Sequence, residues 1–225
     1  MGKMMIVVGP TGSGKTRSVK NLNPESTVII NVTNKPLPFR GSEKIFSEDK
    51  DNLLHLTAWD SIASTIQTIS DEGPHIKYII IDDARYIMEK ELFQKVNVVG
   101  YSKFTEIALH FQTIMETVEN ARKDLIVCMM MHDDDVVNDK AIVGKKCKTV
   151  GRMVDEHYNP LEVVAICLYC SPSFGKDGKP EFKFYTHKIR LNGVEIPAKT
   201  PEDMFSEDTI PNDLNIVFKA IEEYY

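Results

Sequence analysis

No apolar run in the sequence reaches about 18 residues, the length that a membrane-spanning helix needs, so the sequence predicts no membrane span. The apolar stretch near the N-terminus is too short for a signal peptide, and it leads directly into a glycine-rich loop. We therefore expect a cytoplasmic protein that does not associate with membranes.

Cysteine is scarce, and the four cysteines contain a single CxxC pair, Cys167 and Cys170. Both lie in a run typical of a β-strand, where side chains three positions apart point to opposite faces. Zinc ligation by this pair with Cys147 or His187 is the minor alternative, because a second CxxC is missing. The pattern favours reduced, buried thiols.

Three motifs of nucleotide and nucleic-acid enzymes are absent. Asn34-Lys35-Pro36-Leu37 ends in leucine where the guanine-reading motif N-K-x-D has aspartate, so GTP is not the expected ligand. The chain also lacks the paired-arginine lid of nucleoside monophosphate kinases and the acidic cluster of nucleases.

Charge is distributed unevenly along the chain, whose net charge is −6. Residues 201–225 contain seven acids and one base, which accounts for the whole net charge. Residues 140–152 contain five bases and no acid, and most of them lie in the polar, basic segment 133–151, which we expect to form a mobile loop. Three interpretations of this loop stay open: a contact to DNA, a cationic finger offered to a neighbouring subunit's ATP, or a solvated basic segment. The bases concerned are Lys145, Lys146, Lys148 and Arg152.

Apolar runs and helical periodicities alternate along the chain, which predicts an α/β fold with a mainly parallel sheet and helices on both faces. We expect a single domain over residues 1–225, with a core over about 1–170. A C-terminal antiparallel hairpin and an acidic segment follow in residues 171–225. The expected strands are 4–8, 27–32, 78–81, 125–131, 163–169 and 182–186. The expected helices cover residues 14–22, 104–118 and 212–225. A further helix is expected after a capping box formed by Thr57 and Asp60.

The most specific pattern in the sequence follows the first expected strand and matches G-x-x-x-x-G-K-[ST] in full. Glycines allow successive backbone amides to surround a phosphate, and a helix that follows adds its positive N-terminal end. Lys15 is expected to neutralise phosphate oxygens, and the Thr16 hydroxyl to bind magnesium. The residues of this loop are Gly9, Pro10, Thr11, Gly12, Ser13, Gly14, Lys15 and Thr16.

Two further strand ends carry polar residues that suit nucleotide hydrolysis. The strand at residues 78–81 ends in Asp82 and Asp83, of which Asp82 is expected to hold magnesium and Asp83 to polarise the attacking water. The run at residues 125–131 ends at His132, which could contact the γ-phosphate if this strand lies beside the first one. The alternative is a histidine that only caps a loop.

The chain resembles the small phage-encoded, AAA-type, RecA-like ATP-binding proteins found near single-strand binding and recombination genes. The resemblance rests on the glycine-rich loop and on residues 79–88, 100–104, 148–155, 210–214 and 221–225. That family often has Ser-His-Thr-Glu where this chain has Met131-His132-Asp133-Asp134, so His132 is retained and its neighbours differ.

The resemblance implies a RecA-like P-loop core that hydrolyses ATP with magnesium and acts on single-stranded DNA in recombination or replication. It also implies a homo-oligomer in the host cytoplasm and a phage single-strand binding or recombination protein as partner. Two rival hypotheses remain: a nucleotide or nucleoside kinase, and an ATP-dependent interaction module that does not hydrolyse ATP.

Overall fold

The computed structural model describes residues 1–174 and 178–225. The turn of the expected C-terminal hairpin, residues 175–178, therefore lies largely outside the described residues. The strands are β1 (Lys3–Val8), β2 (Thr27–Asn31), β3 (Leu53–Leu54), β4 (Tyr78–Asp82), β5 (Ile126–Met131), β6 (Asp133–Asn138), β7 (Ala141–Cys147), β8 (Ile166–Phe174), β9 (Pro180–Tyr185), β10 (Arg190–Leu191), β11 (Val194–Glu195) and β12 (Thr209–Pro211). The helices are η1 (Thr16–Asn21), α1 (Ser42–Ile45), η2 (Glu48–Lys50), α2 (Trp59–Glu72), α3 (Arg85–Gln94), α4 (Ser102–Asn120), η3 (Met153–His157), α5 (Pro160–Val163) and α6 (Leu214–Tyr224).

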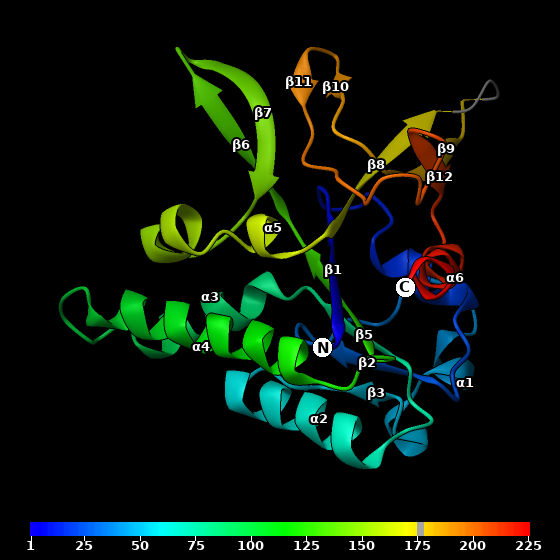
Figure 1. Ribbon diagram of the computed structural model, residues 1–225. Helices are drawn as coiled ribbons and strands as arrows, with labels where there is room; N and C mark the ends of the chain where they lie inside the picture. Colours follow the sequence, from blue (N-terminus) through cyan, green and yellow to red (C-terminus); the bar gives the residue numbers. More distant parts are fainter. Residues whose placement is uncertain (175–177) are drawn as a thin grey trace.

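A mostly parallel sheet forms the centre of the protein, as the alternation of apolar runs and helices predicts (Figure 1). In the described part of the chain its strand order is β12-β9-β8-β1-β5-β4-β2-β3. The pairs from β8 to β3 are all parallel, whereas β9 pairs antiparallel with β8 and with β12. The expected antiparallel addition after residue 170 is therefore confirmed, and β12 extends it.

The two faces of the sheet bury separate hydrophobic cores, because alternate residues of each strand point to opposite sides. In β1, Ile6 and Val8 join the core beneath α2, α3 and α4, whereas Met5 and Val7 join the core beneath α1 and α6. Residues of β5 divide in the same way, and the whole strand is buried. This is the environment that the uninterrupted apolar run at residues 125–131 predicts for a central parallel strand.

The expected helix at residues 14–22 is wrong in type and length. The chain forms the six-residue 3₁₀ helix η1 instead, and the amide of Leu22 donates to the carbonyl of Val19 at its end. Pro24 follows two residues later, and proline disfavours helical backbone in the residue before it. The loop is therefore followed by a short 3₁₀ helix of about two turns rather than by a long α-helix whose dipole points at a ligand.

The expected basic loop at residues 133–151 is also wrong, because most of it forms the antiparallel hairpin β6–β7. Asp139 and Lys140 both have positive φ angles, 48° and 67°, at the hairpin tip. This is the backbone of a two-residue turn that twists with the strands, and such turns usually contain glycine or asparagine. The absence of that signal explains why the sequence does not reveal the hairpin.

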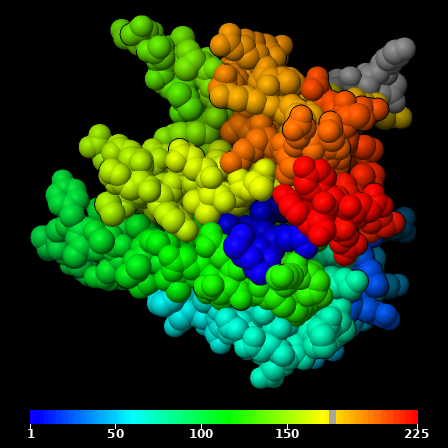
Figure 2. Space-filling view, in the orientation of Figure 1, coloured from blue at the N-terminus to red at the C-terminus, as the bar shows by residue number. Residues whose placement is uncertain are grey.

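The hairpin continues directly from β5 and projects beyond the helices (Figure 1). Together with β10 and β11 it makes a second sheet, whose order within the described residues is β10-β11-β7-β6. The space-filling view shows the hairpin as a separate projection and the C-terminal segment packed beside the N-terminus (Figure 2). The Lys3 ammonium lies 5.9 Å from the centre of the Tyr225 ring.

Of the remaining sequence predictions, those of three helices are confirmed and that of the capping box is wrong. The long apolar stripe predicts α4 correctly, and α2 and α6 also form where expected. The capping box does not: α2 begins after Ala58 without a side-chain cap, and Asp60 accepts a hydrogen bond from the Ser61 amide instead. No helix in the described residues has the length and apolar character that spanning a membrane requires.

Candidate functional site

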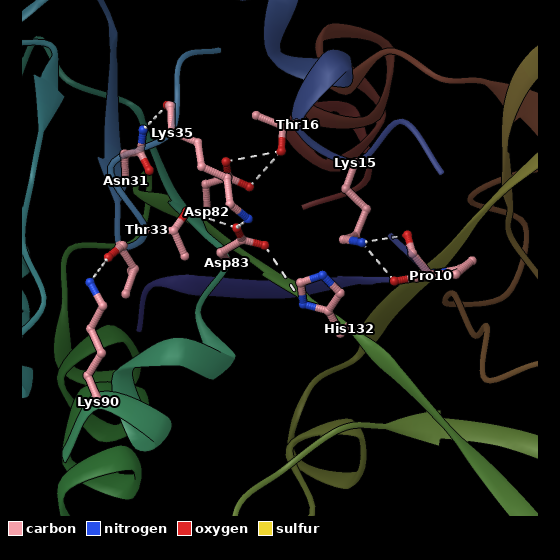
Figure 3. Close-up of polar contacts among 12 residues, drawn as sticks. Pro10, Lys15, Thr16, Asn31, Thr33, Lys35, Asp82, Asp83, Lys90 and His132 are labelled. Carbon is pink, nitrogen blue, oxygen red and sulfur yellow. Dashed lines mark hydrogen bonds and ion pairs between the residues drawn. The ribbon is translucent and has the colours of Figure 1, made fainter. Parts of the chain in front are cut away.

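A cleft of about 490 Å³ lies at the carboxyl ends of β1, β4 and β5. In sheets of parallel strands, ligands bind at this edge, in the crevice where connections leave to opposite sides. The cleft brings together residues that the sequence predicts from three separate segments (Figure 3). Its lining residues are Thr11, Gly12, Ser13, Gly14, Lys15, Thr16, Arg17, Lys35, Pro36, Pro38, Asp82, Asp83, His132 and Phe182.

The glycine-rich loop is hydrogen-bonded to β5 at its first residue, and several backbone amides further along it have no acceptor among the described residues. The amide of Gly9 donates to the carbonyl of Met131 at 3.2 Å, which ties the loop to β5. Gly12 and Gly14 have φ angles of 78° and 95°, where a side chain would strain the backbone. The amides of Gly12, Gly14 and Lys15 have no acceptor among the residues that the structure describes. The loop therefore presents unpaired N–H groups to the cleft.

We expect Gly9→Ala to destabilise the protein by about 2–3 kcal/mol, because a side chain there overpacks the core. A Cβ atom at Gly9 would lie 2.3 Å from the carbonyl oxygen of Cys170 in β8, and backbone cannot move aside easily. Gly144→Ala is the matched control, since its Cβ would meet nothing closer than 3.5 Å. Thermal unfolding of the two variants tests this, and equal midpoints would contradict the close approach of the loop to β8.

Lys15 is buried in the cleft floor with its ammonium group turned back onto the loop. Its Nζ donates to the carbonyls of Gly9 and Pro10 at 2.7 and 3.0 Å. Burial lowers the pKa of Lys15 from its usual value, and the nearby carboxylates oppose that effect only in part. The site therefore contains a desolvated cation whose only hydrogen-bond acceptors among the described residues are neutral carbonyls, and an anion would satisfy it better.

Thr16 and Asp82 form the pair that the sequence predicts as magnesium ligands. The Thr16 hydroxyl lies 2.9 and 3.0 Å from the two carboxylate oxygens of Asp82. Burial raises the pKa of Asp82 to about 6, and the neighbouring Asp83 adds to the rise. A carboxylate with such a pKa is electrostatically destabilised in the absence of a cation.

Asp83 points into the same cleft from a strained backbone position. Its φ angle is 58°, in the left-handed region that aspartate adopts more readily than most residues. Its Oδ2 accepts hydrogen bonds from the Thr33 hydroxyl at 2.9 Å and the Lys35 ammonium at 3.0 Å. Burial alone would raise the pKa of Asp83, but these two hydrogen bonds hold it below its ordinary value.

His132 lies at the tip of β5, which pairs with both β1 and β4, so the expected position beside the first strand is confirmed. Its Nδ1 is 3.8 Å from Asp83 Oδ1, beyond hydrogen-bond distance. Burial and the charge of Lys15 lower the pKa of His132. Nδ1 of His132 and Oγ of Ser13 are both buried with no hydrogen-bond partner in the described residues. Two such atoms in one cleft suit a polar ligand.

Comparison with known proteins gives no further information about this cleft. No protein-family model matches the chain, and no curated protein matches it either. The interpretation of the cleft therefore depends on the residues that line it.

Three residues of the site carry no signal in the sequence that we could use. Thr33 and Lys35 lie just after β2, in a segment that composition marks only as a loop. Phe182 comes from β9. Its ring occupies the space where a Cβ atom of Gly14 would lie, and the ring centre is 5.4 Å from the guanidinium carbon of Arg17. These residues follow or belong to β2 and β9, which lie two or three places from β1 in the sheet, and a single sequence does not reveal that order.

The four bases singled out in residues 140–152 lie outside the cleft lining, and each of the four has an acidic neighbour. Lys145 in β7 pairs with Asp135 in β6 at 2.5 Å, across the hairpin. The remaining pairs are Lys146 with Asp155 at 2.5 Å, Lys148 with Asp134 at 3.9 Å and Arg152 with Glu156 at 3.2 Å. The acids come from just outside the basic stretch. Residues 133–147, which form the hairpin, contain four acids and three bases, so the hairpin has a net charge of −1.

The cysteines behave as the strand pattern predicts. All four are free and buried, and Cys167 and Cys170 belong to the cores on opposite faces of the sheet. Burial raises the pKa of the Cys170 thiol to about 11. Across the described residues, no group of three or more histidine, cysteine or acidic side chains is arranged to hold a metal on its own.

Proposed function

We propose that the protein is a magnesium-dependent ATPase with a RecA-like P-loop core. The observation that carries the proposal is the convergence in one cleft of the glycine-rich loop, Lys15, the Thr16–Asp82 pair and Asp83. These are the parts that phosphoryl transfer needs: backbone donors and a lysine for the phosphates, a metal position, and a residue to orient the nucleophile. The open loop amides and the two unpartnered polar atoms support a polyanionic ligand.

The order of the strands supports the RecA-like part of the proposal. β5 lies between β1, which leads into the glycine-rich loop, and β4, which carries the paired acids. His132 at its tip therefore faces the space between Lys15 and Asp83 (Figure 3). A strand inserted at this place, with a polar residue at its end, is what the resemblance to RecA-like proteins leads us to expect.

Each residue takes a role that its surroundings allow. Lys15 turns from the carbonyls of Gly9 and Pro10 to the phosphate oxygens, which exchanges neutral acceptors for charged ones. Asp83 accepts a hydrogen bond from the attacking water. His132, with an unpartnered Nδ1 among the described residues, donates to or senses the terminal phosphate.

Magnesium fits the pair formed by Thr16 and Asp82. Both supply oxygen, and magnesium usually takes one or two carboxylates together with phosphate oxygens and water rather than a protein cage. The raised pKa of Asp82, about 6, is the mark of a buried carboxylate that lacks a compensating cation. When bound, the metal would neutralise charge on the phosphates during transfer.

Steady-state phosphate release tests the proposal. We expect the purified protein to release inorganic phosphate from ATP in the presence of magnesium and to stop when the metal is chelated. Label from the γ-phosphate that appears on an added nucleoside instead would support the kinase hypothesis. Tight binding of ATP without release of phosphate would support the interaction module.

The proposal includes single-stranded DNA and a homo-oligomer, as the family resemblance implies. The hairpin β6–β7 is the element we assign to DNA, because it projects from the body and continues directly from the strand that carries His132 (Figure 1). Arg152 is the most exposed of the four bases, with 90% of its side chain accessible. It is the residue that a second copy could present to the nucleotide.

The salt dependence of DNA binding tests this part. Replacing Lys145, Lys146 and Lys148 with glutamine should reduce the slope of log affinity against log salt for single-stranded DNA by about two units. Replacing the outward-facing Lys44, Lys50 and Lys123 is the matched control. An unchanged slope in the hairpin variant would assign DNA binding to another surface.

A further inference from the structure

Lys35 is a second lysine of the cleft, and it approaches from the opposite side to Lys15 (Figure 3). Its Nζ donates to Asp83 Oδ2 at 3.0 Å, and it lies 5.6 Å from the centre of the Tyr86 ring. The side chain is 64% exposed, whereas that of Asp83 is only 10% exposed. The contact therefore joins a largely solvent-exposed cation to a buried carboxylate.

The backbone at Lys35 is held by contacts of its own, apart from those of its exposed side chain. The Asn31 side-chain amide donates to the Lys35 carbonyl at 2.7 Å, Asn34 has a φ angle of 55°, and Pro36 follows. These features hold the turn after β2 at the rim of the cleft. The long side chain can then exchange partners while its Cα stays in place.

We propose that Lys35 binds the terminal phosphate of a nucleoside triphosphate and makes the site prefer triphosphates over diphosphates. This inference rests on the proposed function. In the ligand-free protein, Asp83 is the resting partner of Lys35, and the terminal phosphate replaces it. The exchange also frees one acceptor position on Asp83 Oδ2 for the attacking water, while the Thr33 hydroxyl continues to orient the carboxylate.

Charge and position favour this exchange. A terminal phosphate carries more negative charge than one carboxylate and has three acceptor oxygens, so it is the stronger partner for an ammonium group. Lys35 lines the cleft together with Asp82, Asp83 and His132, the residues that we place around the terminal phosphate. A diphosphate held by Lys15 and the loop would lack the group that Lys35 reaches.

Equilibrium binding of two nucleotides tests the inference. Calorimetry with magnesium would compare ADP with the β,γ-imido analogue of ATP in the wild type and in Lys35→Met. Lys90→Met is the matched control, because Lys90 donates to the Val32 carbonyl at 2.5 Å and does not line the cleft. Lys35→Arg keeps the charge and should restore most of the preference.

We expect Lys35→Met to lose about tenfold or more in affinity for the triphosphate analogue and to bind ADP as the wild type does. Unchanged ADP binding also shows that the variant is folded. A preference for triphosphate that survives in Lys35→Met would overturn this inference and leave the proposed function intact. A wild type that binds neither nucleotide would overturn both.

Discussion

Replacing Lys15 with methionine should lower the affinity for ATP at least about 100-fold, because the loss of a buried charged partner costs several kcal/mol. Its ammonium group is enclosed by the loop and lies within 3.0 Å of two carbonyls of that loop. No other cation comes from the loop itself, so the phosphates would lose their main charged contact. Calorimetric titration of ATP with magnesium measures the change.

The fold should survive this substitution. Burial lowers the pKa of Lys15, so the folded protein gains little from keeping a charge there. Lys20→Met is the matched control, because it makes the same chemical change at an exposed position of η1. ATP affinity that is equal in the two variants would contradict the assignment of this loop to the phosphates.

Asp82→Asn should have two opposite effects, and their combination is the second large prediction. Binding of ATP should lose its dependence on magnesium, because a neutral amide is a poor ligand for this cation. The ligand-free protein should become more stable at neutral pH by roughly 2–3 kcal/mol, since a buried, destabilised carboxylate is removed. The Thr16 hydroxyl can still donate to the amide oxygen of asparagine.

The pH dependence gives the sign of the stability effect. The pKa of Asp82 is about 6 in the folded protein, above its ordinary value of 3.8. As the pH rises through this window, the unfolded chain releases the proton first, so the free energy of unfolding falls. Thermal unfolding should show wild type and Asp82→Asn converging below about pH 4, separating as the pH rises to about 6, and keeping a constant difference above it. The exposed acid variant Asp49→Asn should follow the wild type, and parallel curves for all three proteins would contradict the burial of Asp82.

The sequence predicts the parts of this protein that depend on local pattern. The apolar runs that become β1, β4 and β5 are continuous because those strands are buried on both faces. The glycine-rich loop after β1 and the polar residues at the ends of β4 and β5 mark the edge where the cleft forms. Lys15, Asp82, Asp83 and His132 are therefore brought together as the motifs lead one to expect.

Features that depend on distant partners are not visible in the sequence. Lys35 meets Asp83 across 48 positions, because β2 and β4 are neighbours in the sheet. In the sequence, no acid lies among the bases of residues 140–152. In the structure, the hairpin places Asp135 beside Lys145. The hairpin itself is missed because its turn, Asp139-Lys140, has no glycine. The helix after the loop ends within one residue of the expected end, but it begins two residues later and is a 3₁₀ helix, and neither feature has a signal in the sequence that we could use.

Hydrogen exchange with and without ATP and magnesium tests the central claim most directly, because it locates the nucleotide on the chain. The account predicts slower exchange in peptides that cover residues 9–16, 78–85 and 126–133, which border the cleft, and little change in the hairpin strands of the isolated protein. Protection that is absent from these three segments, or confined to another part of the chain, would contradict the assignment of the cleft as the nucleotide site.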